Sequence, residues 1–190
     1  MTDVVLCGVG GQGTVLASKL IAAAAMEKGL EVMSAETIGM AQKGGSVFSY
    51  LRTGKGVRTP MIAKGTADII IAFEPAEAVR VLPFLGEGGK MVVNSHAVKP
   101  VTSVLKESGY DGTEMISYLK RNVPDLTVID CDAACREIGS PKVTNMVLLG
   151  AAVRSGALDF TMDEIKAMMK RMVKPQFLEA NEAALDYDKY

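Results

Sequence analysis

The sequence predicts a doubly wound α/β fold, in which helices cover both faces of a mostly parallel sheet. Short apolar runs bounded by glycine turns alternate along the chain with stretches of helical periodicity. The run at 69–71 is three consecutive isoleucines, as expected of a strand covered on both sides. A glycine-rich turn at 8–13 separates the first strand from the first helix. Together these features indicate a Rossmann-like arrangement.

The elements follow in order from this pattern. Glycines in the segment 36–49 interrupt the helix expected after the second strand. The alternating residues of 46–52, followed by the turn signal TGKG at 53–56, predict an extended hairpin or a lid-like excursion. Thr161 and Glu164 form a capping box, and Pro175 opens a last helix, so the chain is expected to end in a helical pair. We expect strands at 4–7, 30–35, 67–73, 91–94 and 126–129, a turn at 86–89, and helices at 14–28, 75–85, 113–122, from 133, and at 143–154.

Composition limits the functions that the chain can have. Its 190 residues are 48% hydrophobic, enough to bury a substantial core. At this length the chain is most simply one domain spanning 1–190. The net charge of −1, with acidic and basic residues interspersed, argues against nucleic acid or a membrane surface as a partner. Apolar runs are much shorter than the roughly 20 residues of a membrane span. The N-terminus leads directly into the first predicted strand, without the charged segment that begins a signal peptide. We therefore expect a cytoplasmic protein.

The cysteines and the histidine offer little chemistry of their own. Cys7, Cys131 and Cys135 are odd in number and fit a reducing compartment rather than a disulfide framework. Cys131 and Cys135 are spaced to share a metal on one helical face, but two small core residues are the simpler interpretation, and no metal site is predicted. His96 is the single histidine, so no Ser-His or Cys-His nucleophile pattern is present. We predict no catalytic residue on this chain.

The turn GVGGQG at 8–13 is the clearest functional motif. Glycines let the backbone approach a ligand closely, and the first N–H groups of the following helix attract a phosphate. The alternative is that these glycines only allow close packing of strand and helix. Glu36 ends the second strand, where an acid contacts a ribose in dinucleotide-binding proteins, but a cap or surface role is equally consistent.

Further motifs give the chain a family resemblance. It resembles the γ subunit or γ domain of the 2-oxoacid:ferredoxin oxidoreductases, which pair a GxGGQG loop with a Gln-basic-Gly-Gly-Ser-Val segment and a strand ending in arginine. Within that family, KPQFLEAN at 174–181 is most similar to the β subunit of indolepyruvate ferredoxin oxidoreductase. The matching segments are QKGGSV at 42–47 with Arg52, Ala67-Asp68, EPAEA at 74–78, Gly89 before VVN at 92–94, and NMVLLG at 145–150.

The resemblance implies oxidative decarboxylation of a 2-oxoacid, here indolepyruvate or another aryl pyruvate, to an acyl-CoA. It implies that thiamine diphosphate and iron–sulfur clusters lie on a larger α subunit that passes electrons to ferredoxin, since this chain lacks the thiamine pattern and the ferredoxin cysteines. This chain alone would be inactive and would help to bind coenzyme A. The implied site residues are Gly8, Gly10, Gly11, Gln12, Gly13 and Thr14 around phosphate, Lys43 and Arg52 as cations, Gly44 and Gly45 in the second glycine turn, and Ser46 and Asn145 as hydrogen-bonding groups.

The sequence leaves open the roles of several residues and the class of function. Lys43 replaces the arginine common in the family, which keeps the charge but not a bidentate contact, and both Lys43 and Arg52 could be solvated loop charges. The methionines at 162–172 are spaced as core residues or as a partner surface. Instead of an oxidoreductase subunit, the chain could be an NAD(P)-dependent dehydrogenase or a non-catalytic nucleotide-binding module.

Overall fold

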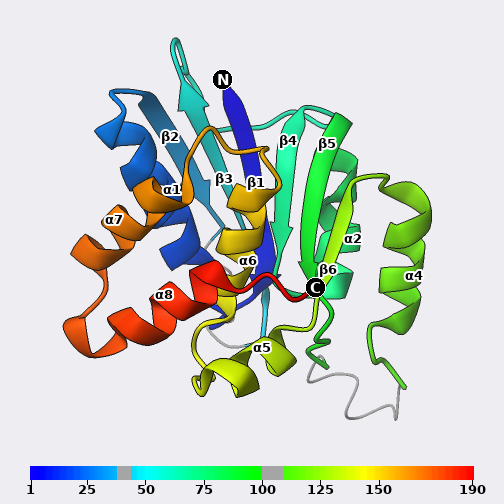
Figure 1. Cartoon of the computed structure of the whole chain (residues 1–190). Helices are drawn as coiled ribbons and strands as arrows, with labels where there is room; N and C mark the ends of the chain where they lie inside the picture. The colour runs from blue at the N-terminus through cyan, green and yellow to red at the C-terminus, as the bar shows by residue number, and fades with distance from the viewer. Residues whose placement is uncertain (38–43, 100–108) are drawn as a thin grey trace.

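The computed structural model describes residues 1–37, 44–99 and 109–190. The strands in these ranges form one six-stranded sheet (Figure 1). β3 runs antiparallel to both of its neighbours, while the β1–β4, β4–β5 and β5–β6 pairs are parallel. The prediction of a mostly parallel, doubly wound sheet is therefore confirmed. The order is β2-β3-β1-β4-β5-β6, with β1 at Thr2–Val9, β2 at Glu31–Glu36, β3 at Ser46–Gly54, β4 at Ala67–Ala72, β5 at Leu85–Asn94 and β6 at Leu126–Ile129.

Helices cover both faces of this sheet, as predicted. One face packs against α1 (Thr14–Glu27), α5 (Cys131–Ile138), α6 (Thr144–Arg154) and the C-terminal pair α7 (Met162–Met172) and α8 (Leu178–Asp186). The opposite face packs against α2 (Pro75–Val81) and α4 (Thr113–Asn122). Alternate residues of β1 enter the two clusters, because successive side chains of a strand point to opposite faces.

The predicted excursion turns out to be part of the main sheet. A hairpin is present, but it joins β2 to β3, which pair antiparallel. The predicted turn at 53–56 is not its turn, because within residues 44–99 no strand follows β3 before β4 at Ala67. The lid-like alternative is wrong for 46–52, because β3 inserts between β2 and β1 and pairs along β1 from Thr2↔Thr53 to Val9↔Ser46. This insertion is stable because β3 buries residues such as Tyr50 and Leu51. The intervening residues 38–43 lie outside the described part of the chain.

Smaller differences occur at the ends of elements. Residues 86–89, predicted as a turn, belong to β5, and the pairing with β4 shifts register between Ala67 and Ile69. α5 starts two residues earlier than predicted because the Asp130 carboxylate accepts from the N–H of Ala133. The predicted capping box is confirmed: the Glu164 N–H donates to Thr161 Oγ1 at 3.2 Å, and the Thr161 N–H donates to the Glu164 carboxylate at 2.8 Å. Short 3₁₀ turns occupy Leu82–Phe84 and Pro175–Phe177.

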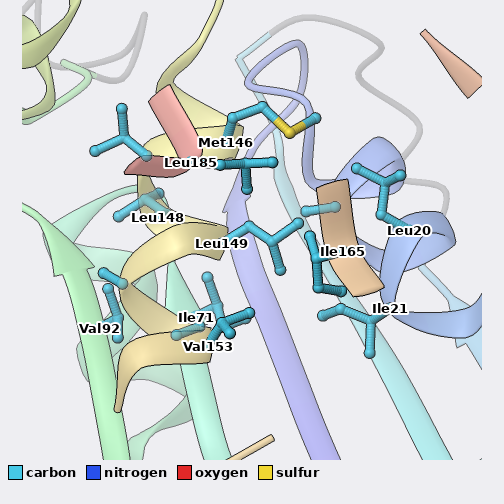
Figure 2. Packing of buried hydrophobic residues seen from close by; sticks show 14 of the residues in the cluster. Leu20, Ile21, Ile71, Val92, Met146, Leu148, Leu149, Val153, Ile165 and Leu185 are labelled. Carbon is cyan, nitrogen blue, oxygen red and sulfur yellow. The ribbon is translucent and has the colours of Figure 1, made fainter. Parts of the chain in front are cut away.

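Helix α6 is the centre of the larger core. Nine consecutive residues, 145–153, are buried where the helix lies between the sheet and α8 (Figure 2). Gly150 allows this, because a Cβ at that position would lie 2.3 Å from the carbonyl oxygen of Leu185 in α8. Met146, Met168 and Met169 are also in this core, which supports the interpretation of most of these methionines as packing residues. None of the helices in the described ranges is long and apolar enough to cross a membrane.

Candidate functional site

The glycine loop joins β1 to α1 and is braced by its own glutamine. The N–H of Val9 donates to Gln12 Oε1 at 2.7 Å, and Gln12 Nε2 donates to the carbonyl of Phe73, which follows β4, at 3.1 Å. A Cβ on Gly8 would lie 2.7 Å from Gln12 Oε1 and 2.8 Å from the Cβ of Phe73, so only glycine fits beneath this brace. The packing alternative therefore accounts for Gly8, and the Gln12 side chain is occupied by the loop itself.

The rest of the loop leaves backbone donors open. The N–H of Gly10 is used, because it donates to the carbonyl of Gly45 at 2.9 Å. Within the described ranges, the N–H groups of Gly11, Gly13 and Thr14 have no acceptor in the protein. Gly13 is the N-cap of α1 and adopts φ 88°, a left-handed conformation that costs other residues about 1–2 kcal/mol. These free donors at a helix N-terminus are the feature that binds anions.

A cavity of about 420 Å³ opens beside these donors, at the carboxyl ends of β1 and β5. This is where ligands bind in doubly wound sheets. Its walls come from the glycine loop, the end of β5, the start of α5 and the start of α6. The lining residues are Gly11, Gln12, Gly13, Asn94, His96, Asp132, Pro141, Lys142, Thr144 and Asn145.

Asn94, at the end of β5, fixes a second wall of the cavity. It is buried, and its Nδ2 donates to the same Phe73 carbonyl that accepts from Gln12, at 3.2 Å. Its Oδ1 accepts from the N–H groups of His96 and Cys131, at 3.2 and 3.3 Å. The Phe73 carbonyl is therefore a common anchor for two walls of the cavity.

Four predicted residues line this cavity together: Gly11, Gln12, Gly13 and Asn145. Asn145 sits in the first turn of α6, and a Cβ on Gly13 would lie 3.2 Å from its Nδ2, so the starts of α1 and α6 are in contact. Gly8, Gly10 and Thr14 belong to the loop without lining the cavity. Lys43 lies outside the described residues.

Gly44 and Ser46 line a different cavity, of about 260 Å³, together with Glu74, Glu77 and Tyr110. The Ser46 hydroxyl donates to Glu77 Oε2 at 2.5 Å, and the Tyr110 hydroxyl donates to Glu74. Glu77 also accepts from Arg80 Nε at 3.2 Å. Ser46 was expected as a hydrogen-bonding group of the site, and in this arrangement its hydroxyl is bound to Glu77, beside buried carboxylates that would repel an anion.

Arg52 lies at the other end of the sheet. Arg52 pairs with Asp3 of β1, whereas the loop end of β1 is Val9, six residues later. At the usual rise of a strand, six residues separate Arg52 from the loop by about 20 Å. Its Nε donates to Asp3 Oδ1 at 2.8 Å, and its Nη1 reaches the carbonyl of Met61 at 3.3 Å. The expectation that Arg52 is a cation of the same site is therefore corrected: it neutralises a buried aspartate.

Six residues of the cavity lining were not predicted as site residues, and three of them, His96, Asp132 and Lys142, carry acidic or basic side chains. His96 Nδ1 and Asp132 Oδ2 are 2.6 Å apart on one wall, and Lys142 lies two residues before α6. Sequence signals existed for them, because His96 follows a strand end, Asp132 is in the first turn of a helix and Lys142 precedes one. Such signals are too common to single out a site without the spatial arrangement.

The two buried cysteines, Cys7 and Cys131, do not provide a reactive group. Burial, reinforced by the charges of Glu77 and Glu74, raises the pKa of the Cys7 thiol well above its usual value. Burial likewise raises the pKa of Cys131. Both groups are therefore held as neutral thiols, which are poor nucleophiles. In residues 1–37, 44–99 and 109–190, no cluster of three or more His, Cys, Asp or Glu side chains is arranged to hold a metal.

Comparison with known proteins gives consistent matches over nearly the whole chain. A family model described as pyruvate ferredoxin/flavodoxin oxidoreductase matches residues 3–187. Indolepyruvate oxidoreductase subunit IorB of Archaeoglobus fulgidus is 35% identical over 184 residues, covering 96% of this chain and 91% of that protein. Pyruvate oxidoreductase subunit PORC of Thermotoga maritima matches in structure with a TM-score of 0.67 at 26% identity, covering 97% of this chain and 93% of its own.

A larger protein also contains this fold. The structure of 2-oxoglutarate:ferredoxin oxidoreductase from Magnetococcus marinus, with 2-oxoglutarate, coenzyme A and succinyl-CoA bound, matches with a TM-score of 0.67 at 21% identity. The match covers 97% of this chain but 30% of that one. At this identity the likeness shows the fold alone, here as one part of a longer polypeptide.

Proposed function

Because the chain belongs to the pyruvate ferredoxin/flavodoxin oxidoreductase family, we propose that it is the small subunit of a 2-oxoacid:ferredoxin oxidoreductase. The similarity to an indolepyruvate oxidoreductase subunit over 96% of the chain carries this proposal and favours indolepyruvate or another aryl pyruvate as substrate. We assign thiamine diphosphate and the iron–sulfur clusters to a larger α subunit, which passes electrons to ferredoxin. The buried, neutral Cys7 and Cys131 thiols support placing the clusters on the partner.

We further propose that this chain helps to bind coenzyme A in the cavity beside the glycine loop. The residues fit an anionic ligand, because the N–H groups of residues 11, 13 and 14, at and just before the start of α1, have no acceptor in the described ranges. The close approach of Gly13 to Asn145 leaves no room there for a side chain. Coenzyme A, when bound, would supply the thiol that accepts the acyl group. The role of this chain would be to hold the phosphorylated end and so to position the thiol toward the partner.

Lys43 stays a proposed cation of this site. Gly45, two residues later, accepts from the Gly10 N–H at 2.9 Å, so the chain leaving 38–43 meets the glycine loop directly. A lysine near this point would add charge attraction for a phosphate without the two-pronged geometry of an arginine. Arg52 is not included, because it pairs with Asp3 at the far end of β1.

The dehydrogenase alternative is less well supported. In a dinucleotide-binding fold the strand ending in the ribose-binding acid lies next to β1. Here β3 separates β2 from β1, so that Glu36 at the end of β2 pairs with Ser49 and is displaced by one further strand, about 4.8 Å. No residue of the described cavity offers the proton relay expected beside a hydride acceptor other than the exposed His96–Asp132 pair.

The domain and the compartment are also proposals. We propose that residues 1–190 make one domain, because a single sheet connects the first strand to the last helices. We propose a cytoplasmic location, because all three cysteines are free and two of them are buried.

Gly13→Ala in the assembled complex tests the cofactor site. The new methyl group would force a strained backbone and contact Asn145, so we expect the KM for coenzyme A to rise about tenfold, with kcat little changed, as for a loss of uniform binding. Gly29→Ala is the matched control, since Gly29 also adopts a left-handed conformation, φ 70°, but at the opposite end of α1 with open space around it. Equal KM values for the two variants would refute the site, and a chain that never co-purifies with a cluster-bearing partner would refute the subunit assignment.

A further inference from the structure

Two helices begin at the cavity without any capping group. In the described part of the chain, side chains of Glu74, Asp130 and Thr161 cap α2, α5 and α7. α4 and α8 lack such a cap but carry Glu114 and Glu179 in their first turns. α1 and α6 have neither a side-chain cap nor an acidic residue in the first turn. Their N-termini therefore keep open N–H donors and an uncompensated positive end of the helix dipole.

Asn145 provides an independent sign of a missing acceptor at α6. The residue is 6% exposed, and its Oδ1 accepts from the N–H of Met146 at 3.0 Å. Its Nδ2 has no acceptor among the described residues, yet it borders the cavity close to Gly13. Every fully buried side-chain N or O atom of the described residues has a hydrogen-bond partner, so this Nδ2 is open to the cavity, where a ligand or water can accept from it. The donor is thus placed for an oxygen atom inside the cavity.

The charges around the cavity also favour an anion at this end. Lys142 lines the cavity two residues before α6 and forms no ion pair within the described ranges. Asp132 is the acidic residue of the lining, and it is engaged by His96 at 2.6 Å. The lysine is therefore free to meet a ligand, whereas the aspartate already has a partner.

We infer that the start of α6, with Asn145 and Lys142, is a second anion subsite beside the glycine loop, so that the cavity binds a diphosphate rather than a single phosphate. One phosphate would lie on the N–H groups of α1 and the other on those of α6, with Asn145 Nδ2 between them. This inference deepens the proposed function and rests on it, since coenzyme A contains a diphosphate. The two phosphate contacts alone identify the ligand as a diphosphate compound, so the inference does not depend on any contact to an adenine ring.

Direct titration of the assembled complex with inorganic diphosphate and orthophosphate, without magnesium, tests the inference. Because two subsites act together, we expect diphosphate to bind at least roughly tenfold more tightly than orthophosphate, the equivalent of one additional charge-assisted contact. Lys142→Met and the nearly isosteric Asn145→Asp should each reduce that preference about fivefold or more by removing the cation or adding a repelling carboxylate. Lys55→Met, which removes an exposed charge beyond the far end of β3, should leave it unchanged.

The outcomes separate the inference from the proposed function. The inference is overturned if diphosphate binds no more tightly than orthophosphate, or if Lys142→Met and Asn145→Asp behave like the Lys55→Met control. If those variants are silent while Gly13→Ala still raises the KM for coenzyme A, the cofactor site stands without a second subsite. If they abolish the diphosphate preference while Gly13→Ala leaves that KM unchanged, the subsite stands and its ligand is not coenzyme A.

Discussion

Gly150→Ala sets two opposing effects against each other in the middle of α6. Alanine is the better helix former, which alone would stabilise the helix by about 1 kcal/mol. The added Cβ, however, would lie 2.3 Å from the carbonyl oxygen of Leu185 and 3.0 Å from its Cα. Those are backbone atoms of α8, so no side-chain rotation can relieve the contact, and overpacking of this kind costs about 1–3 kcal/mol and sometimes more. Because α8 would have to shift as a whole to relieve the contact, we expect an overpacking cost near the upper end of that range, about 3 kcal/mol.

The expected result is a net loss of about 2 kcal/mol in the free energy of unfolding. For a chain of this length that loss corresponds to a fall in Tm of roughly 4–8 °C. Urea unfolding followed by circular dichroism measures the free energy, and a thermal scan measures Tm. Gly156→Ala, in the turn after α6 with open space around it, controls for the change of residue type, although its φ of 74° adds local strain. A Gly150→Ala protein as stable as the wild type would show that α6 and α8 are not packed as described.

Two further predictions concern charged and titratable groups. Arg52→Ala should lower the free energy of unfolding in urea by about 2–3 kcal/mol, because it leaves the buried Asp3 carboxylate without its partner, and should leave the KM for coenzyme A unchanged. Stability should fall as pH rises above about 9, because the folded protein holds the Cys7 and Tyr110 protons more tightly than the unfolded chain. Burial raises the pKa of Cys7, and burial with the hydrogen bond to Glu74 raises that of Tyr110, so urea titrations of Tyr110→Phe should show a shallower decline near pH 10–11.

The regular elements could be predicted because each depends on local chemistry. The isoleucine run at 69–71 is apolar at every position and lies in β4, and the Thr161–Glu164 capping box marks the start of α7. The position of β3 in the sheet could not be predicted in the same way. Strand order depends on which edges meet in space, and nothing in the alternation of 46–54 distinguishes a strand beside β2 alone from one inserted between β2 and β1.

The same insertion explains which of the predicted site residues lie together at the cavity. The glycine loop is a local feature, so its donors and its place before α1 follow from the sequence, and Asn145 joins it at the start of α6. Ser46 and Arg52 depend instead on the path of β3. Since β3 runs antiparallel to β1, its first residue lies beside the glycine loop, and its later residues move steadily away from it. A strand in the parallel direction would have placed Arg52 at the loop end and Ser46 far from it.

The direction of β3 therefore determines where cations can act. The resemblance groups Lys43, Ser46 and Arg52 in one motif, but only the start of the strand can lie near a ligand held by the loop. The ion pair with Asp3 gives Arg52 a sufficient structural reason to be present, which matters because a buried aspartate needs a partner. A cation from a segment distant in sequence does border the cavity, because Lys142, two residues before α6, is among its lining residues. Residues of one sequence motif therefore need not lie together in space. Here the pairing register of β1 and β3 keeps Ser46 at the loop end and places Arg52 far from it.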